Sequence, residues 1–365
     1  MIEYENLGKS NAIFFENYRR SFENILIGGS YILGDNITKF EQDFAQYINV
    51  KNGIGVANGL DALIIALKSL DLTDGDEVIV PNRTWIATAH APMMLGAKPV
   101  LVDVLPDQPI MDTSLIREKI TSRTKAIMPV QLNGRAVEME AVWEVAKEYD
   151  LAVVEDSAQG LFSKYEGKYM GTLSDAGCFS LSVAKLIPTG QGGFIATQRK
   201  DIYDKMRLIR THGVDNVNAG TPFLSMGFNF RYTDIQASIG LVQLGKVTKR
   251  IENLKLVYEK YRSGLSEIDY LKLIPVNIEQ GEIPLYIEVL VEEREKLMEY
   301  LTSHNIETRP FYPDLDSAVH LKCHGEFPNA HVFGKQGLAL PCGPDQPMEN
   351  VNLVLKSLHL FGLVK

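Results

Sequence analysis

The sequence predicts an α/β protein with a large domain built on a mainly parallel sheet and a smaller C-terminal α+β domain. Three observations support this prediction. Short runs rich in Val and Ile alternate with helical patterns between about residues 50 and 200, as in parallel sheets covered by helices on both faces. A long helical pattern follows at 233–265. The chain of 365 residues, 45% of them hydrophobic, is long enough for two domains.

The apolar runs give the expected strands and the segments between them the expected helices. We expect strands at Gly53–Ala57, Glu77–Pro81, Pro99–Val104, Ala126–Val130, Leu151–Glu155, Cys178–Leu181 and Phe194–Thr197. We expect helices at 60–70, 86–96, 113–120, 137–149 and 199–210. The large domain is placed at 35–240, and the small domain at 241–365 together with 1–34. A strand at Pro284–Val291 and a helix at Arg294–His304 belong to the second domain.

Composition excludes several classes of protein. Lysine and arginine number 37 against 46 acidic residues, a net charge of −9 with no basic stripe, so nucleic acid is a poor partner. The three cysteines, Cys178, Cys323 and Cys342, have no metal-ligand spacing, and the histidines are scattered. The chain shows no signal-peptide pattern and no run long enough to span a bilayer. We therefore expect a soluble cytoplasmic protein without a metal.

Lys185 and Asp156 suggest the chemistry of the protein. Lys185 lies in a loop before Gly190, between two expected strands, and Asp156 follows an earlier strand. Either residue alone is more often a surface or capping residue. In this order they suit pyridoxal phosphate (PLP), because the amine forms a Schiff base with the cofactor and the acid keeps the ring nitrogen protonated. Two charges about 4 Å apart interact by roughly 4 kcal/mol at an effective dielectric near 20, enough to hold the ring charged.

Four further residues could hold the same cofactor. Gly59 opens a strand-to-helix turn whose free N–H groups can bind a phosphate, although a plain helix cap by Asn58 is the commoner use of such a turn. Ser180 could donate its hydroxyl to the phosphate. Gln159 would lie one turn beyond Asp156 if a helix starts there. Trp85 could stack on the ring or could be a core tryptophan.

A nicotinamide-dependent dehydrogenase is the competing enzyme class. Gly53, Gly55 and Gly59 superficially match its glycine fingerprint. The third glycine comes one place too late, and no acid at a strand end follows at about 20 residues. The sequence therefore favours PLP over a dinucleotide.

Many ordered segments resemble the DegT/DnrJ/StrS family of PLP-dependent sugar aminotransferases, with perosamine synthases as the most similar branch. The matching segments are Gly28–Gly34, Val56–Leu63, Thr84–Thr88, Gly96–Asp103, Pro129–Gly134, Glu155–Gln159, the Lys185 loop, Gly227–Arg231, Asp234–Gly240, Ile306–Phe311 and Leu340–Pro344. The resemblance implies a fold-type I transferase and a homodimer whose active sites lie at the subunit interface.

The resemblance also implies the role of each site residue. Lys185 would carry the cofactor, Asp156 would pair with the pyridine nitrogen, and Gln159 would contact the phenolic oxygen. Further cofactor contacts are expected from Gly59, Leu60, Ser180 and Trp85 of the same chain and from Asn229 of the other subunit. Arg231 and Arg309 are candidates for anionic substrate groups, with surface or dimer salt bridges as the alternative for both.

The expected reaction moves an amino group from an amino acid, L-glutamate in relatives, to a keto group of a nucleotide-linked sugar. Two departures from the family pattern lie beside Lys185. Gln191 stands where many relatives have Glu or Asp, and Ser182 stands where they often have His, Tyr or Asn. Two alternatives therefore stay open: a small keto-phosphate or cyclitol ketone as the substrate, and a PLP-binding regulatory protein without turnover.

Overall fold

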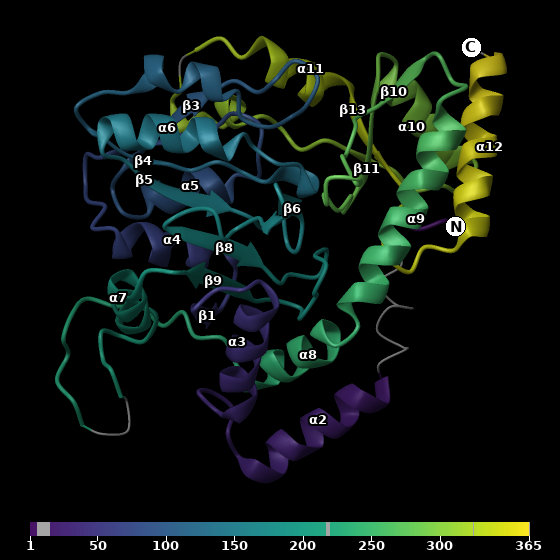
Figure 1. Ribbon diagram of the computed structural model, residues 1–365. Coiled ribbons are helices and arrows are strands. Elements are labelled where there is room, and N and C mark those ends of the chain that lie inside the picture. Colours follow the sequence, from purple (N-terminus) through teal and green to yellow (C-terminus); the bar gives the residue numbers. More distant parts are fainter. Residues whose placement is uncertain (6–14, 217–219, 324, 365) are drawn as a thin grey trace.

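One seven-stranded sheet forms the centre of the protein. The computed structural model describes residues 1–5, 15–216, 220–323 and 325–364 (Figure 1). In the order β1-β9-β8-β5-β4-β2-β3, neighbours from β3 to β8 run parallel, and β9 is antiparallel to both of its neighbours. The strands are β1 Asn52–Val56, β2 Glu77–Pro81, β3 Lys98–Val102, β4 Thr124–Ile127, β5 Ala152–Asp156, β8 Ala176–Ser180 and β9 Gly193–Thr197. The predicted mainly parallel α/β architecture is confirmed.

Helices cover both faces of this sheet. Successive apolar side chains of each strand point to opposite faces, so each face needs its own covering of helices. Val78 and Val80 of β2 face one cluster, whereas Ile79 between them faces another. The first face is covered by α4 Gly59–Ser69, α5 Ala87–Met93 and α7 Lys200–Arg210, and the second by α3 Asp35–Tyr47 and α6 Met139–Tyr149. All seven predicted strands of this region exist, with ends that differ by up to three residues.

A second, smaller sheet lies to one side of the first (Figure 1). Its order is β10-β11-β13-β12, with strands β10 Leu271–Leu273, β11 Ile287–Val291, β12 Arg309–Pro310 and β13 Gly337–Leu340. Helices α9 Val247–Leu265 and α12 Met348–Val364 lie side by side and pack with α10 Arg294–Ser303 into its core. The other elements are α2 Phe15–Gly28, α8 Asp234–Leu244, α11 Pro328–Gln336, the hairpin β6 Lys164–Tyr165 and β7 Lys168–Tyr169, and short 3-10 turns.

Two predicted helices differ from the observed ones. The pattern at 233–265 is broken into α8 and α9, because Lys246, which follows the C-cap residue Gly245, leaves the helical conformation with φ −120° and ψ 2°. The predicted helix at 113–120 is a pair of 3-10 turns, Thr113–Leu115 and Arg117–Lys119. Asp112 accepts hydrogen bonds from both the N–H and the hydroxyl of Ser114, a local arrangement that competes with an α-helix.

The first residues of the chain pack where the sequence placed them, against the small sheet. Ile2 pairs with Ile306, and Glu5 pairs with Cys342. Helix α2 instead packs on α8, which spans the predicted domain boundary near residue 240. The exact division into domains stays a prediction. None of the described helices has both the length and the apolar character needed to cross a membrane.

Buried polar contacts join the two sheets. Arg135 lies 2.6 Å from Glu288 of β11 in a fully buried ion pair. Asn133, in the left-handed region at φ 53°, donates to the same carboxylate at 2.9 Å and accepts from the N–H of Tyr286 at 2.7 Å. Removing one partner of such a pair would leave a buried charge uncompensated, so the two sheets are held in one relative position.

Gly177 lies in β8, the strand beside β5, and a substitution there tests how tightly this strand is packed. A Cβ atom at this position would lie 1.9 Å from the carbonyl oxygen of Gly171, a backbone atom that cannot move aside. We expect Gly177→Ala to lower the free energy of unfolding by about 3 kcal/mol, the upper range for overpacking. Urea unfolding followed by circular dichroism measures the loss. Gly28→Ala, at a glycine with no atom within 4 Å of the added methyl group, is the control and should change stability by about 0.5 kcal/mol or less.

Candidate active site

Asp156 lies at the carboxyl end of β5, the middle strand of the large sheet. Its side chain is only 5% exposed, and its Oδ2 accepts a hydrogen bond from Thr88 Oγ1 at 2.7 Å. The N–H of Ala158 donates to the other carboxylate oxygen at 3.2 Å. Burial raises the pKa of Asp156 above its usual value, although these two hydrogen bonds and the charge of Lys185 oppose the shift. A carboxylate in this state is stabilised by a cation placed opposite it.

Lys185 is held in the loop between β8 and β9. The loop is closed at its base, where the N–H groups of Leu181 and Thr189 donate to Gly192 and Leu181 at 2.8 Å. Burial lowers the pKa of Lys185 to about 8, and the charges of Asp156 and Glu5 oppose this shift. The charges of Lys185 and Asp156 thus act on each other, while the role predicted for each toward a cofactor stays a prediction.

The strand ends explain why these residues meet. Strands β1, β2, β5 and β8 all point in one direction. Their carboxyl ends therefore lie at one edge of the sheet, where ligands bind in such folds. Gly59 follows β1, Trp85 follows β2, and Lys185 follows β8.

The start of α4 lies against the end of β8. Asn58 caps the helix by accepting from the N–H of Asp61 at 2.9 Å. In the described parts of the chain the N–H groups of Gly59 and Leu60 find no acceptor, so both can bind an anion. A Cβ at Gly59 would lie 3.0 Å from that of Ser180, so the glycine keeps open the space beside the serine hydroxyl. The helix cap and the phosphate-site prediction are thus compatible.

Gln159 and Trp85 are joined to the site through Tyr312. The predicted helix after Asp156 is absent: the chain makes a turn there, with the N–H of Gly160 donating to Ser157 at 3.0 Å. Gln159 Oε1 accepts from the N–H of Asn133 at 3.0 Å, and the Gln159 side chain is near enough to Tyr312 to oppose the rise in the pKa of its phenol. Trp85, 58% exposed, meets the Tyr312 ring edge to face at 5.6 Å. Its exposed face is therefore available for stacking.

Three predicted residues lie apart from this group. Asn229 and Arg231 bond to each other, with Arg231 donating to Asn229 Oδ1 at 2.7 and 3.0 Å. Arg231 pairs with Val56 of edge strand β1, and no described contact joins either side chain to Lys185. A contribution of Asn229 across a dimer stays a prediction. Arg309 stacks on the Tyr4 ring at 4.5 Å, 3.6 Å from Glu307.

The two departures from the family pattern shape the Lys185 loop. The backbone carbonyl of Gln191 accepts from Thr189 Oγ1 at 2.7 Å and from Gln236 Nε2 at 2.8 Å. The N–H of Ser182 donates weakly to Ser180 Oγ at 3.4 Å. At position 191 the described loop contacts use the backbone carbonyl rather than the side-chain amide.

Sequence reasoning missed four residues of the site. Thr88, although part of a quoted motif, was given no role, and Tyr312 lies one residue beyond another motif. Burial raises the pKa of Tyr312 to about 12. Tyr286 donates its hydroxyl to the carbonyl of Ala184 at 3.0 Å, beside Lys185. Glu5 acts on Lys185 from the other end of the chain. Of these four residues, only Thr88 and Tyr312 lie in or next to a sequence motif that could have identified them.

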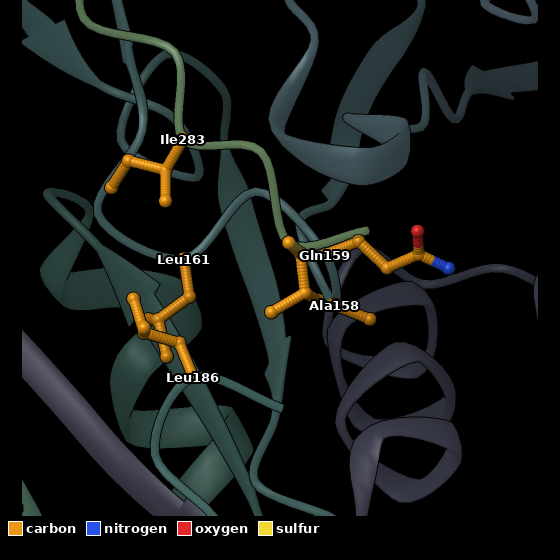
Figure 2. A pocket seen from close by; sticks show the side chains of 6 residues that line it. Ala158, Gln159, Leu161, Leu186 and Ile283 are labelled. Atoms are coloured by element: carbon orange, nitrogen blue, oxygen red, sulfur yellow. The ribbon is translucent and has the colours of Figure 1, made fainter. Parts of the chain in front are cut away.

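A small pocket lies behind the Lys185 loop. Figure 2 shows Leu161, Leu186 and Ile283 around it, with the amide of Gln159 directed away from these apolar side chains. Its volume of about 10 Å³ is that of one water molecule, too small for a cofactor. The pocket is therefore a packing gap between the loop and the segment that enters β11.

A possible metal-ligand cluster is already paired internally. Asp314, Asp316 and His331 bring their ligand atoms within 4.8 Å of one another. Arg83 forms a buried ion pair with Asp314 at 2.7 Å, and His331 pairs with Asp316 at 2.9 Å. The Arg83 guanidinium also lies over the Tyr312 ring at 4.6 Å. Through Arg83, the cluster therefore packs against the ring of Tyr312.

Comparison with known proteins agrees with the architecture and the order of motifs. Residues 15–359 match the sequence model of the DegT/DnrJ/EryC1/StrS aminotransferase family. A GDP-perosamine synthase from Escherichia coli O157:H7 is 36% identical over 335 residues, 90% of either chain. A dTDP-3-amino-3,6-dideoxy-alpha-D-galactopyranose transaminase from Aneurinibacillus thermoaerophilus is 33% identical over 99% of this chain and 100% of its own length. The resemblance predicted from the motifs is confirmed.

A solved structure gives the same result for the fold. The crystal structure of S. venezuelae DesV in complex with a ketimine intermediate superposes with a TM-score of 0.95 and 28% identity. The match covers 99% of this chain and 98% of the other. The predicted transferase fold therefore holds for nearly the whole chain.

The lowered pKa of Lys185 gives a test that needs no substrate. Because the amine becomes neutral near pH 8, its acylation in the cofactor-free protein should rise through about pH 8. Labelling at a series of pH values, followed by peptide mass spectrometry, measures the midpoint, with exposed Lys51 in the same sample as reference. In Asp156→Asn the midpoint should fall further, because the Asp156 charge raises the pKa of Lys185. A midpoint near that of Lys51 would contradict the described burial.

Proposed function

We propose that this chain, which belongs to the DegT/DnrJ/EryC1/StrS aminotransferase family, uses PLP to move an amino group from an amino acid to a ketone on a nucleotide-linked sugar. Membership of the family makes the protein an aminotransferase enzyme. The cofactor, both substrates and the assembly are the proposed part. The observation that carries it is the placement of Asp156 at the end of β5 and of Lys185 in the loop after β8, at the same edge of the sheet, where the charge of each acts on the other.

The residues present fit the cofactor at each of its ends. Asp156 is a buried carboxylate whose pKa is raised by burial, and a protonated ring nitrogen would be a cation that stabilises its charged form. The free N–H groups at the start of α4 and the Ser180 hydroxyl suit a phosphate, and the lack of a side chain at Gly59 leaves room for it. Trp85 offers an exposed aromatic face between these ends.

The chain's own residues would perform the proton transfers. When bound, PLP supplies an aldehyde that condenses with amines and a ring that withdraws electrons from the breaking C–H bond. Lys185 would hold the cofactor and, once displaced by the substrate amine, could take up a proton at Nζ and return it. A pKa of about 8 is suited to both steps near neutral pH. Asp156 would keep the ring nitrogen protonated throughout, and Gln159, fixed by Asn133, would orient the ring.

The names of the relatives support the substrate class. The two relatives described above are named for products carried on GDP and dTDP. We infer that this chain also takes a nucleotide-linked ketone, with L-glutamate as the amino donor. Arg231 and Arg309 remain the candidates for anionic groups of these substrates. The departures at Gln191 and Ser182 concern the loop described above and give no specific support to a different ketone.

Exposed apolar side chains support the proposed homodimer. On and after α2, Phe22, Leu26 and Ile27 are exposed, Ile27 by 86%. Phe223 and Met226, exposed by 80% and 71%, extend from the segment that leads to Asn229. Exposed groups of large apolar side chains mark interaction surfaces, and α2 and the segment before Asn229 each carry such a group. A partner covering them would bring its own Asn229 segment toward a site.

Activity with a panel of ketones tests the proposed function. Purified protein with PLP and L-glutamate should convert nucleotide-linked keto-sugars to amino sugars, detected by mass spectrometry, and should not convert the same sugars without the nucleotide. Lys185→Arg keeps the positive charge but cannot easily exchange protons, and it should lose at least about 10³-fold in kcat. Activity only with a small keto-phosphate or cyclitol ketone would contradict the proposed substrate.

Asp156→Asn separates catalysis from stability. Loss of a charge pair worth roughly 4 kcal/mol should lower kcat by about 10³-fold, while PLP still binds. A carboxyl group with a raised folded pKa stabilises a protein at low pH and loses this contribution as pH rises, so the charged form is costly at pH 7. The cofactor-free variant should therefore unfold at the same temperature as wild type or higher. Scanning calorimetry measures this, and a large drop would argue against the described burial.

A further inference from the structure

The chain that follows Tyr312 is fixed to the end of β2. The N–H of Leu315 donates to the backbone carbonyl of Asn82 at 3.0 Å. Asp316 donates its N–H to Asn82 Oδ1 at 2.9 Å and accepts from Asn82 Nδ2 at 2.9 Å. Asn82 is fully buried, so water does not compete for these hydrogen bonds. This segment is therefore held in one position beside β2.

Arg83, the next residue, holds the same segment with a single guanidinium group. Its Nη1 lies 2.7 Å from Asp314 Oδ1 in a buried ion pair and donates to the backbone carbonyl of Tyr312 at 2.5 Å. The guanidinium also lies over the rings of Phe311 and Tyr312, at 4.9 and 4.6 Å from their centroids. Hydrogen bonds and ring contacts together restrict the position and the orientation of this planar group, and with them the orientation of the rings.

The Arg83 ion pair contributes more to geometry than to stability. Arg83 is only 1% exposed, and among the described residues its Nε has no hydrogen-bond partner. Removing two charges from water costs about as much free energy as their attraction returns, so apolar residues of similar volume would be at least as stable. Buried polar contacts are satisfied in one arrangement only. The effect of Arg83 is therefore expected in the placement of the groups that it touches.

The ring that Arg83 holds meets Trp85. The centroids of the Tyr312 and Trp85 rings are 5.6 Å apart, and the two planes are nearly perpendicular, at 89°. Edge-to-face contacts of this kind are favourable in a limited range of orientations. Trp85 is 58% exposed, so the protein packs against only part of its indole. Loss of the fixed Tyr312 ring would therefore free the indole to rotate.

The same short segment also reaches Asp156. Thr88 donates to Asp156 Oδ2 at 2.7 Å, and its hydroxyl oxygen lies 2.9 Å from that of Thr84. Because each hydroxyl has one proton, Thr84 is the donor to Thr88. Both threonines are buried. The segment from Arg83 to Thr88 thus holds the two aromatic rings in a fixed relation to the acid at the end of β5.

We propose that Arg83 is a positioning residue of the active site, which holds the rings of Tyr312 and Trp85 as one wall beside the cofactor position. The assignment rests on the proposed function, in which Trp85 stacks on the cofactor ring. Arg83 touches neither cofactor nor substrate, because Asp314, Phe311 and Tyr312 enclose its guanidinium. It acts through the orientation of the two rings, and misplacement by about 1 Å costs about 10²-fold in rate.

The fluorescence of Trp85 tests this assignment without turnover. The chain has two tryptophans, so Trp143→Phe leaves Trp85 as the sole emitter. In this background and without cofactor, Arg83→Lys should lower the steady-state anisotropy of the Trp85 emission. The reason is that an ammonium group is not planar and cannot reproduce the hydrogen bonds and the ring contacts together. An unchanged anisotropy would overturn the assignment.

Arg210→Lys is the matched control. Like Arg83, Arg210 is buried and binds one carboxylate and one backbone carbonyl, those of Glu41 at 2.7 Å and Gly55 at 3.0 Å. This variant should lose a similar amount of stability in thermal unfolding while the Trp85 anisotropy stays unchanged. If both variants lower the anisotropy equally, general destabilisation accounts for the effect and the assignment is wrong.

A double variant shows whether Arg83 acts through Tyr312. Tyr312→Leu removes the ring and should lower the Trp85 anisotropy at least as much as Arg83→Lys. Adding Arg83→Lys to Tyr312→Leu should lower it no further, because the two residues act as one unit. Additive losses would contradict the assignment. If Arg83→Lys does not fold, Asp314→Asn replaces it and should give a smaller loss in the same direction, since the hydrogen bond to the Tyr312 carbonyl remains; no loss would again overturn the assignment.

Kinetics of the loaded enzyme connect this geometry with the reaction. Arg83→Lys should lower kcat by about 10- to 100-fold, while KM for each substrate stays within about threefold. Arg210→Lys should leave kcat within about twofold. A normal kcat beside a lowered anisotropy would show that the wall does not serve the reaction, and the assignment would fail alone. If wild type aminates no nucleotide-linked ketone, the proposed function fails, and the role of Arg83 in the reaction fails with it.

Discussion

The opposition of Asp156 and Lys185 is the constraint on which the rest of the site depends. Each group is removed from water, and burial shifts each pKa toward the neutral form. The described groups that favour the charged form of Asp156 are the charge of Lys185, the Thr88 hydroxyl and the N–H of Ala158. The fold places Asp156 and Lys185 after neighbouring strands, β5 and β8, whose parallel register brings Asp156 opposite Cys178. A cofactor with a cationic nitrogen and an electrophilic carbon would satisfy both groups at once.

Residues in and next to the second sheet hold in place parts of the site that belong to the first sheet. The large sheet supplies the acid, the lysine and the start of α4, but residues that hold Gln159 and the Lys185 loop in place include Tyr286, 102 residues beyond Ala184, and Glu288, 155 residues beyond Asn133. Asn133 orients Gln159 and is itself held by Tyr286 and Glu288. Tyr286 also restrains the backbone beside Lys185. Because these contacts are buried and polar, they specify one geometry rather than merely adding apolar area.

How much the sequence could predict follows from the range of each interaction. The strands, the acid at a strand end and the Gly59 turn depend on patterns of a few residues, and all were placed correctly. The break at Lys246 and the turns after Asp112 depend on single local hydrogen bonds or dihedral angles that a helical pattern does not encode. Glu5 and Tyr312 could not be found, because they reach the site only through contacts between segments far apart in the chain.

The arrangement of charge bears on how one site can serve two different substrates. An aminotransferase must admit an amino acid and a ketone in turn at the same lysine. A site with a single strongly charged wall would hold one of them too tightly and exclude the other. Here Arg309 is held on the small sheet by Tyr4 and Glu307, while Asp156 is held at the end of β5 by hydrogen bonds from Thr88 and Ala158. The charges of Arg309 and Asp156 are thus held by different parts of the fold, with separate partners.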